Sequence, residues 1–237
     1  MIKMKDFIII KNVLLVSTKE NKNLIDIPDL QFDKNSISVI MGHNGSGKTL
    51  LLNLLQGLIT PNSGSIRFNP KIRNCKNFIS IMMQKPTFLR RTTQQNIQFI
   101  LDLNKNRTRI SFLEVLERFD LVPQKNILAN KLSGGEKQRL SLALATSINS
   151  KILLLDEPTA NADPLTTFRI EKIIKEEASA GKKIILVTHS IAQAKRLGQD
   201  LIFINNGKVL EQNKATKFFT QSKTKEIVQF LKGEIIL

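Results

Sequence analysis

The stretch that decides the fold is Gly42-His43-Asn44-Gly45-Ser46-Gly47-Lys48-Thr49. It follows the apolar run Ser36 to Met41, which predicts a buried strand, and it precedes Leu50 to Leu58, which has the pattern of a helix. A glycine-rich loop between a strand and a helix is typical of a P-loop, where backbone N–H groups and the helix N-terminus bind phosphate. We expect all eight residues to bind phosphate, with Lys48 neutralising its charge and Thr49 offering its hydroxyl to Mg²⁺.

The rest of the chain repeats this alternation of apolar runs and helical patterns. Two further pairs follow, 151–155 with 166–178 and 183–187 with 191–197. This is the βαβ pattern of a parallel sheet buried on both faces. From about 85 to 131 the pattern is helical instead, notably over 110–119. The sequence therefore predicts an α/β fold in one domain, 1–237, with a mostly parallel core (about 1–84 and 132–237) and an inserted helical subdomain (about 85–131).

Two more segments carry polar side chains suited to chemistry. The apolar run 151–155 ends in Asp156-Glu157, and ligands bind at the carboxyl ends of strands in α/β sheets. We expect Asp156 to hold Mg²⁺ and Glu157 to polarise an attacking water. The second segment, Leu132-Ser133-Gly134-Gly135-Glu136-Lys137-Gln138-Arg139, by itself predicts a helix capped by Ser133.

With these motifs in this order, the chain resembles the ATP-binding subunits of ABC transporters over nearly all of its length. The resemblance implies a P-loop NTPase fold with an N-terminal antiparallel β part, ATP and Mg²⁺ as cofactors, and hydrolysis of ATP by a homodimer. It also implies that Ser133, Gly134 and Gly135 hold the γ-phosphate of the ATP bound to the partner chain's P-loop. Dimer closure and nucleotide binding would then be one event.

Three single residues match the same family by type and order. Gln84 corresponds to the glutamine that joins the active site, including Mg²⁺, to the helical subdomain. Asp163, in Asn161-Ala162-Asp163, corresponds to the loop at which the two chains touch. His189 corresponds to the histidine that bonds the γ-phosphate. The resemblance thus implies that the catalytic residues are Glu157, His189, Gln84 and Lys48. It implies that the residues holding the metal are Thr49, Gln84 and Asp156.

The chain departs from the family pattern at two places. His43 stands where the family often has Pro, and we expect its ring to be exposed. Between Leu15 and Lys19, where the family usually stacks an aromatic ring on adenine, the chain has no aromatic residue. We therefore expect nucleotide binding to depend on the phosphates more than is usual.

Composition narrows the functional classes. Cys75 is the only cysteine and there are two histidines, so an intrachain disulfide and a His/Cys zinc cage are excluded and a reduced cytoplasm fits. The net charge of +16 would suit an anionic partner, but the cations are scattered and the chain has neither Trp nor Tyr to stack on bases. A solvated basic surface is the simpler interpretation, and we expect no direct binding to nucleic acid.

We expect an importer's ATP-hydrolysing subunit, peripheral at the cytoplasmic face of the inner (plasma) membrane. Its partners would be a separate permease, docked near Pro86 to Arg91, and an extracytoplasmic solute-binding protein. Three segments, Lys85 to Arg91, Ala160 to Pro164 and Ala192 to Leu197, are similar to those of ATPases of tungstate and related oxyanion importers. The alternatives are the ATPase of an exporter, which more often shares its chain with the membrane domain, and a soluble ABC ATPase acting on nucleic acid. The latter generally has two cassettes or a long coiled-coil insertion.

Overall fold

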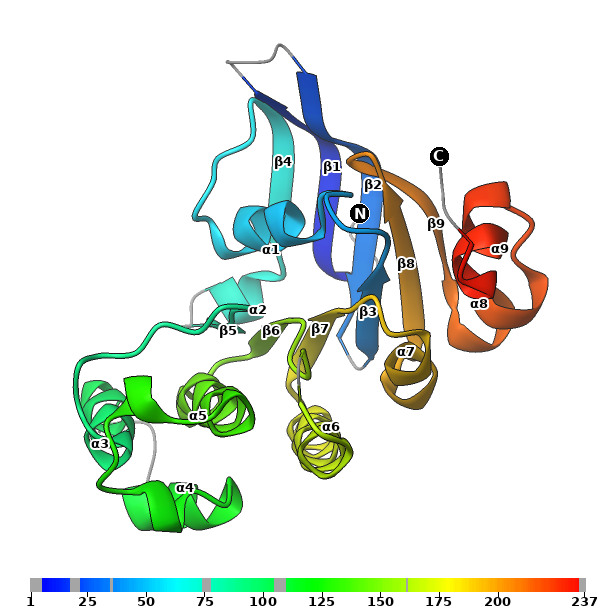
Figure 1. Ribbon diagram of the computed structural model, residues 1–237. Helices are drawn as coiled ribbons and strands as arrows, with labels where there is room; N and C mark the ends of the chain where they lie inside the picture. Colours follow the sequence, from blue (N-terminus) through cyan, green and yellow to red (C-terminus); the bar gives the residue numbers. More distant parts are fainter. Residues whose placement is uncertain are drawn as a thin grey trace. The chain divides into compact units, whose positions relative to one another are not determined.

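The computed structural model describes residues 6–17, 22–34, 36–73, 78–104, 110–160 and 162–234 (Figure 1). Lys19, Cys75 and Asn161, which were named above, lie outside these ranges. The chain divides into two compact units, one formed by Met1–Cys75 with Lys183–Leu237 and the other by Lys76–Lys182.

The first unit contains two groups of strands. An antiparallel sheet is formed by β1, β2 and β4, with β1 paired to both neighbours. In the second group β3 is parallel to β7 and β8, and β9 is antiparallel to β8. The elements of this unit are β1 (Asp6–Ser17), β2 (Lys22–Asp33), β3 (Ile37–Met41), α1 (Lys48–Gln56), β4 (Ser63–Phe68), α2 (Pro70–Arg73), β7 (Lys183–Val187), α7 (Ile191–Leu197), β8 (Asp200–Asn205), β9 (Lys208–Lys214), α8 (Ala215–Gln221) and α9 (Lys225–Lys232).

The parallel strands of the first unit are its core. Every residue of β3 and β7 is buried, which explains their continuous apolar sequence, because a strand covered on both faces has no polar side to alternate with. The register aligns Ile40 with both Val187 and Ile202, so the three strands end at the same edge. That edge carries the segments that follow β3 and β7.

A buried cation lies at the opposite ends of the same strands. Lys183 begins β7, and its Nζ donates to the backbone oxygen of Ser36 at 2.8 Å and to the hydroxyls of Ser36 and Ser38 at 2.7 and 2.8 Å. The Ser38 hydroxyl donates in turn to Asp200. Burial lowers the pKa of Lys183 to about 7, although the carboxylates of Asp200 and Asp33 act in the opposite direction.

Because Lys183 is buried, we expect the free energy of unfolding of the chain to depend on pH. Its pKa is about 7 in the folded chain and about 10.4 in an unfolded one, so between these values the unfolded state binds more protons. The contribution of Lys183 to the free energy of unfolding should therefore rise, on the order of 2–4 kcal/mol, as the pH increases from 7 to 10. The effect is the difference between the pH profiles of the parent and of Lys183→Met in denaturant unfolding, since the other titratable groups are present in both proteins. Parallel pH profiles would contradict the shifted pKa.

The second unit is mostly helical. Its strands β5 (Ile79–Met82) and β6 (Ile152–Asp156) are parallel, and α5 packs on β5, α3 and α6. The helices are α3 (Thr93–Leu103), α4 (Phe112–Arg118), α5 (Gly134–Ser147) and α6 (Pro164–Ser179), with 3₁₀ turns η1 (Val122–Gln124) and η2 (Ala129–Lys131). The predicted fold class is confirmed, because an antiparallel N-terminal sheet accompanies mostly parallel core strands. The boundary of a separate helical subdomain at 85 and 131 stays a prediction.

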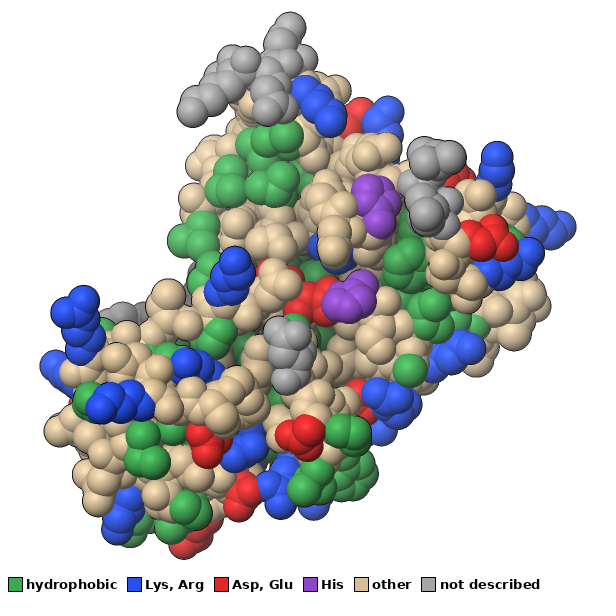
Figure 2. Space-filling model, in the orientation of Figure 1, with side chains coloured by type: hydrophobic (Ala, Val, Ile, Leu, Met, Phe, Trp, Pro, Cys, Tyr) green, Lys and Arg blue, Asp and Glu red, His purple; other side chains and the backbone are tan. Residues whose placement is uncertain are grey.

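Charged side chains are spread over the surface. Figure 2 shows Lys and Arg side chains at many separate points of one face, with acidic side chains among them. Some of the exposed cations are paired, as Lys208 is with Asp26 at 3.8 Å and Lys214 with Asp33 at 3.7 Å. Within the described ranges, no helix is both long enough and apolar enough to cross a bilayer.

Candidate active site

The P-loop occupies the edge at which β3 ends. Gly47 takes the N-cap position of α1 with φ at 105° and provides no side-chain cap, so no side chain competes for the N–H groups at the helix start. Gly42 has no room for a side chain, because a Cβ atom there would lie 2.1 Å from the backbone oxygen of Ile204. The Ser46 hydroxyl is buried and, among the described residues, lacks a hydrogen-bond partner. The loop is therefore shaped to present backbone donors to an anion.

Lys48 is held over this loop. Its side chain is buried, and Nζ donates to the backbone oxygens of Gly42 at 2.9 Å and His43 at 2.8 Å. Thr49, the next residue, is exposed in the first turn of α1. A fixed ammonium group and an accessible hydroxyl thus stand at the same helix start.

The β8–β9 turn supports the P-loop from the side. The backbone N–H of Gly207 donates to the Ser46 oxygen at 2.9 Å. The ring of His43 lies 2.6 Å from Asn205 Oδ1 through Nε2 and 2.7 Å from the Asn44 oxygen through Nδ1. The expectation of an exposed His43 ring was wrong, since the ring is half-buried and joins the loop to the turn. Sequence reasoning missed this support, because it depends on a contact between the loop and a turn 162 residues away.

His189 follows the strand next to the P-loop strand. β7 is paired with β3, and the N–H of Thr188 donates to the Ile40 oxygen at 3.2 Å. His189 comes directly after Thr188 and is exposed. The first unit therefore brings His189 and the P-loop to the ends of adjacent strands, as expected for residues that share a ligand.

In the second unit, the two predicted carboxylates end β6. Asp156 and Glu157 are buried, with side chains 4% and 7% exposed. Glu157 has φ at 48°, and it is the only residue other than Asn, Asp or Gly with positive φ in the described part of the chain. Such a backbone conformation costs roughly 1–3 kcal/mol and concentrates at functional sites. Gln84 follows β5, which is parallel to β6, so the same strand edge carries all three side chains.

The segment 132–139 forms the start of α5. Ser133 is its N-cap, and a capping box joins the Ser133 side chain to the N–H of Glu136 and the Glu136 carboxylate to the N–H of Ser133. Burial by itself would raise the pKa of Glu136, but the hydrogen bonds from Ser133 and the charge of Arg139 outweigh it, and the pKa is lowered. Ser133 and Gly134 are exposed, so the capped helix start is open to a ligand.

Asp163 lies close to this helix start, as the N-cap of α6. Its Oδ1 accepts from the N–H groups of Leu165 and Thr166, both at 2.9 Å. The Thr166 hydroxyl donates to Oδ2 at 2.6 Å. These bonds from Thr166 outweigh the effect of burial and lower the pKa of Asp163, so it stays a carboxylate. Asp163 thus has a local structural task, and its contact with a second chain stays a prediction.

The described residues at the end of β1, where the family pattern has an aromatic ring for adenine, include no aromatic residue. Leu15 is buried, while Val16 and Ser17 are half-buried at the end of β1. Phe7, the aromatic residue nearest the start of β1, is 4% exposed and belongs to the core.

Comparison with known proteins supports the same assignment. Residues 25–160 match the sequence model of the family described as ABC transporter. The tungstate uptake system ATP-binding protein TupC of Peptoclostridium acidaminophilum is 36% identical over 193 residues, which cover 79% of this chain and 90% of the relative. The L-cystine import ATP-binding protein TcyC of Bacillus subtilis is 30% identical, with 90% of this chain and 92% of the relative covered.

A solved structure agrees with these sequence matches. It is the dimeric structure of a post-hydrolysis state of the ATP-binding cassette MJ0796 bound to ADP and Pi. The TM-score is 0.77 at 27% identity, and the match covers 87% of this chain and 98% of the other. The fold, the two groups of strand-end residues and these relatives agree that the chain belongs to the ABC transporter family, as an ATP-binding and ATP-hydrolysing subunit of the importer type.

Proposed function

We propose that the chain hydrolyses ATP as a homodimer to power solute import through a separate membrane permease, at whose cytoplasmic face it docks. The observation that carries the proposal is the open start of α5, where the exposed Ser133 and Gly134 are fixed by a capping box. A second helix start exposed in this way is suited to close over an anion that the P-loop of another copy has bound. The dimeric state of the structural neighbour supports this arrangement.

The proposed metal is Mg²⁺, brought with ATP. The chain offers a hydroxyl from Thr49, a carboxylate from Asp156 and an amide oxygen from Gln84, and hard oxygen donors of this kind suit Mg²⁺. The described ranges contain no cluster of three or more His, Cys, Asp or Glu residues that could hold a metal. This fits Mg²⁺, which usually takes one or two carboxylates and completes its shell with phosphate oxygens and water. Bound there, it would neutralise charge on the phosphates.

The other residues have distinct proposed roles. Lys48 holds the phosphates, Glu157 orients and polarises the attacking water, and His189 hydrogen-bonds the γ-phosphate. Asp163 contacts the second copy. Phosphoryl transfer needs little more than such positioning and charge stabilisation, so fixed backbone donors and a strained carboxylate suit these proposed roles.

A surface groove after Gln84 is the proposed permease contact. Its volume is about 210 Å³, and its walls include Met83, Pro86, Phe88, Leu144 and Ile148. Arg90 and Arg91 follow on the same loop, and both are exposed. An apolar groove beside two cations suits a short amphipathic segment of a membrane protein.

The loop that carries these arginines is held in one shape by Asn96. This side chain is 2% exposed, and its Nδ2 donates to the oxygens of Leu89, Arg91 and Thr92 at 3.3, 3.2 and 3.0 Å. Its Oδ1 accepts from the N–H of Leu89 at 3.0 Å. Because the loop is ordered before any partner binds, docking on it should cost little conformational entropy.

Charge reversal on this loop should weaken docking. We expect Arg90→Glu with Arg91→Glu to lower the fraction of subunit retained on the permease at least about tenfold, because like charges at an interface cost several kcal/mol. Binding of ATP to the isolated subunit should be unchanged. Co-purification and nucleotide titration measure the two quantities.

The matched control is Lys217→Glu with Lys223→Glu, which changes the net charge equally on exposed residues at and beyond α8. The control should stay attached. Equal retention of both double variants would place the permease contact elsewhere.

The proposed solute is an oxyanion such as tungstate, supplied by a solute-binding protein. The support is the similarity to the tungstate uptake subunit, whereas the cystine relative shows that related subunits serve other solutes. The test is to purify the permease that binds this chain, reconstitute the complex in liposomes and measure ATP hydrolysis with the binding protein loaded with tungstate, phosphate or cystine. Stimulation by cystine alone would contradict an oxyanion.

A further inference from the structure

Thr166 connects two segments for which dimer contacts are proposed. Its side chain is 4% exposed, although it lies in the first turn of α6, two residues after the exposed Pro164. The hydroxyl donates to Asp163 Oδ2 at 2.6 Å and accepts from Arg139 Nη1, on α5, at 3.4 Å. One hydroxyl therefore bridges the N-cap of α6 and the helix that Ser133 begins.

The two helix starts also touch directly. A Cβ atom at Gly135 would lie 3.4 Å from Thr166 Oγ1, 3.5 Å from its Cγ2 and 3.8 Å from Asp163 Oδ2. The first turn of α5 therefore lies within van der Waals reach of Thr166 and Asp163. Gln138, one turn further along α5, donates to the Ala160 oxygen at 3.4 Å.

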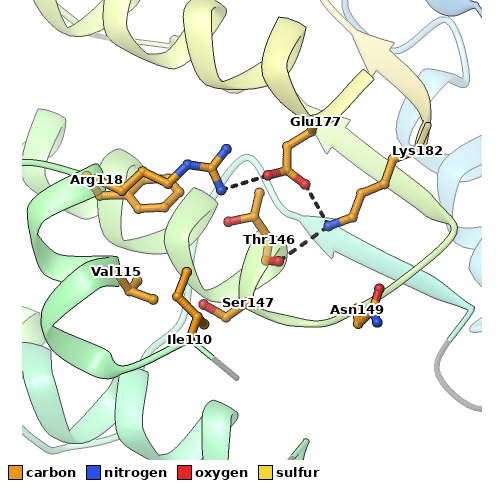
Figure 3. Close-up of a pocket in the computed structure, with 9 residues that line it drawn as sticks. Ile110, Val115, Arg118, Thr146, Ser147, Asn149, Glu177 and Lys182 are labelled. Atoms are coloured by element: carbon orange, nitrogen blue, oxygen red, sulfur yellow. Dashed lines mark hydrogen bonds and ion pairs between the residues drawn. The ribbon is translucent and has the colours of Figure 1, made fainter. Parts of the chain in front are cut away.

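The far ends of the same helices are joined as well. Glu177, near the end of α6, binds Arg118 at 2.8 Å and Lys182 at 2.7 Å, and Lys182 donates to the Thr146 oxygen at the end of α5 (Figure 3). The Glu177 side chain is 8% exposed, so these pairs are less screened than surface pairs. With both ends joined, α5 and α6 should move as one body.

We propose that Thr166 is a positioning residue that locks the helix start at Ser133–Gly135 to the Asp163 loop, so that both reach the second copy in one fixed arrangement. The proposal rests on the proposed function, since it assumes an ATP-dependent dimer. Neither contact of the Thr166 hydroxyl is needed to bind ATP at the P-loop. Its loss should therefore impair dimer closure and turnover rather than nucleotide binding.

The test compares Thr166→Val with Thr166→Ser, each in a Glu157→Gln background that accumulates the closed dimer. Val keeps the shape but removes the hydroxyl, whereas Ser keeps the hydroxyl. We expect Val to raise the protein concentration for half-maximal ATP-driven dimerisation about tenfold or more, because a hydrogen bond to a charged group is lost. Ser should restore most of the dimerisation. Binding of a fluorescent ATP analogue to the dilute monomer should be equal in all three proteins.

The matched control is Thr167→Val, because the Thr167 hydroxyl takes part in none of these contacts; it should dimerise like the parent. If Thr166→Val also dimerises like the parent, or if Ser is as impaired as Val, Thr166 is not the positioning residue. If the Glu157→Gln parent itself stays monomeric with ATP, the proposed function fails instead. In the wild-type background the same substitution should lower kcat with little change in KM.

Discussion

Replacing Glu157 by Gln is expected to lower ATP turnover by at least about 10²–10⁴, the contribution of a positioned general base, while ATP binding is kept. Gln has nearly the same shape but cannot polarise the attacking water as a carboxylate does. The buried, left-handed position of Glu157 at the end of β6 supports this role, because the fold accepts a strained backbone there. Single-turnover hydrolysis and equilibrium ATP binding measure the two quantities separately.

The structural consequence of this variant should be equally clear. With binding intact and hydrolysis blocked, two chains should stay closed around two ATP molecules, which gel filtration or light scattering detects. Glu117→Gln is the control, since it removes an exposed carboxylate on α4. Hydrolysis by Glu157→Gln at the parental rate would show that Glu157 is not the base.

The elements that could be predicted from the sequence are those whose signal is local. The strand 183–187 and the helix 191–197 were expected at the bounds that β7 and α7 have. A strand buried on both faces is a continuous apolar run, and the helix that follows is capped by Ser190. Two helices begin two residues earlier than predicted, α1 at Lys48 instead of Leu50 and α6 at Pro164 instead of Thr166. The first turn of α1 contains the polar Lys48 and Thr49, so the apolar pattern used for the prediction begins after the helix does. The start of α6 is marked instead by the N-cap Asp163 and by Pro164 at the first helical position.

The features that could not be predicted depend on contacts between distant residues. His43 and Asn205 are 162 positions apart, and only the hairpin between β8 and β9 brings the second to the first. The Arg139 contact with Thr166 likewise requires α5 and α6 to pack with their starts together. The sequence places Thr166 three residues after the N-cap Asp163, so a local contact between these two side chains could be expected. It does not indicate which helix lies beside Thr166.

The other large effect is expected at Lys48. Replacing this residue should weaken the binding of ATP itself, whereas replacing Glu157 should lower turnover and keep ATP binding. Lys48→Ala removes the ammonium that Gly42 and His43 hold over the loop, so the phosphates lose a fixed positive partner. Hydrogen bonds between charged groups contribute about 1.5–3 kcal/mol, and ATP affinity should fall roughly 10- to 150-fold. Lys48→Arg should not fully restore it, because a planar guanidinium cannot take the geometry of the compact ammonium.

Calorimetric titration with ATP and Mg²⁺ measures this loss, and Lys217→Ala, an exposed lysine on α8, is the control for the change in charge. Since Lys48 also donates to two loop carbonyls, part of the loss could come from a relaxed loop. Titration with free triphosphate separates the two causes. A lost charge weakens ATP and triphosphate by the same factor, whereas a rearranged loop, which also changes the neighbourhood of the base, weakens them unequally. Unchanged affinity for both would contradict the assignment of 42–49 as the phosphate-binding loop, because Lys48 is the charged side chain of that loop and a bound phosphate would have to interact with it.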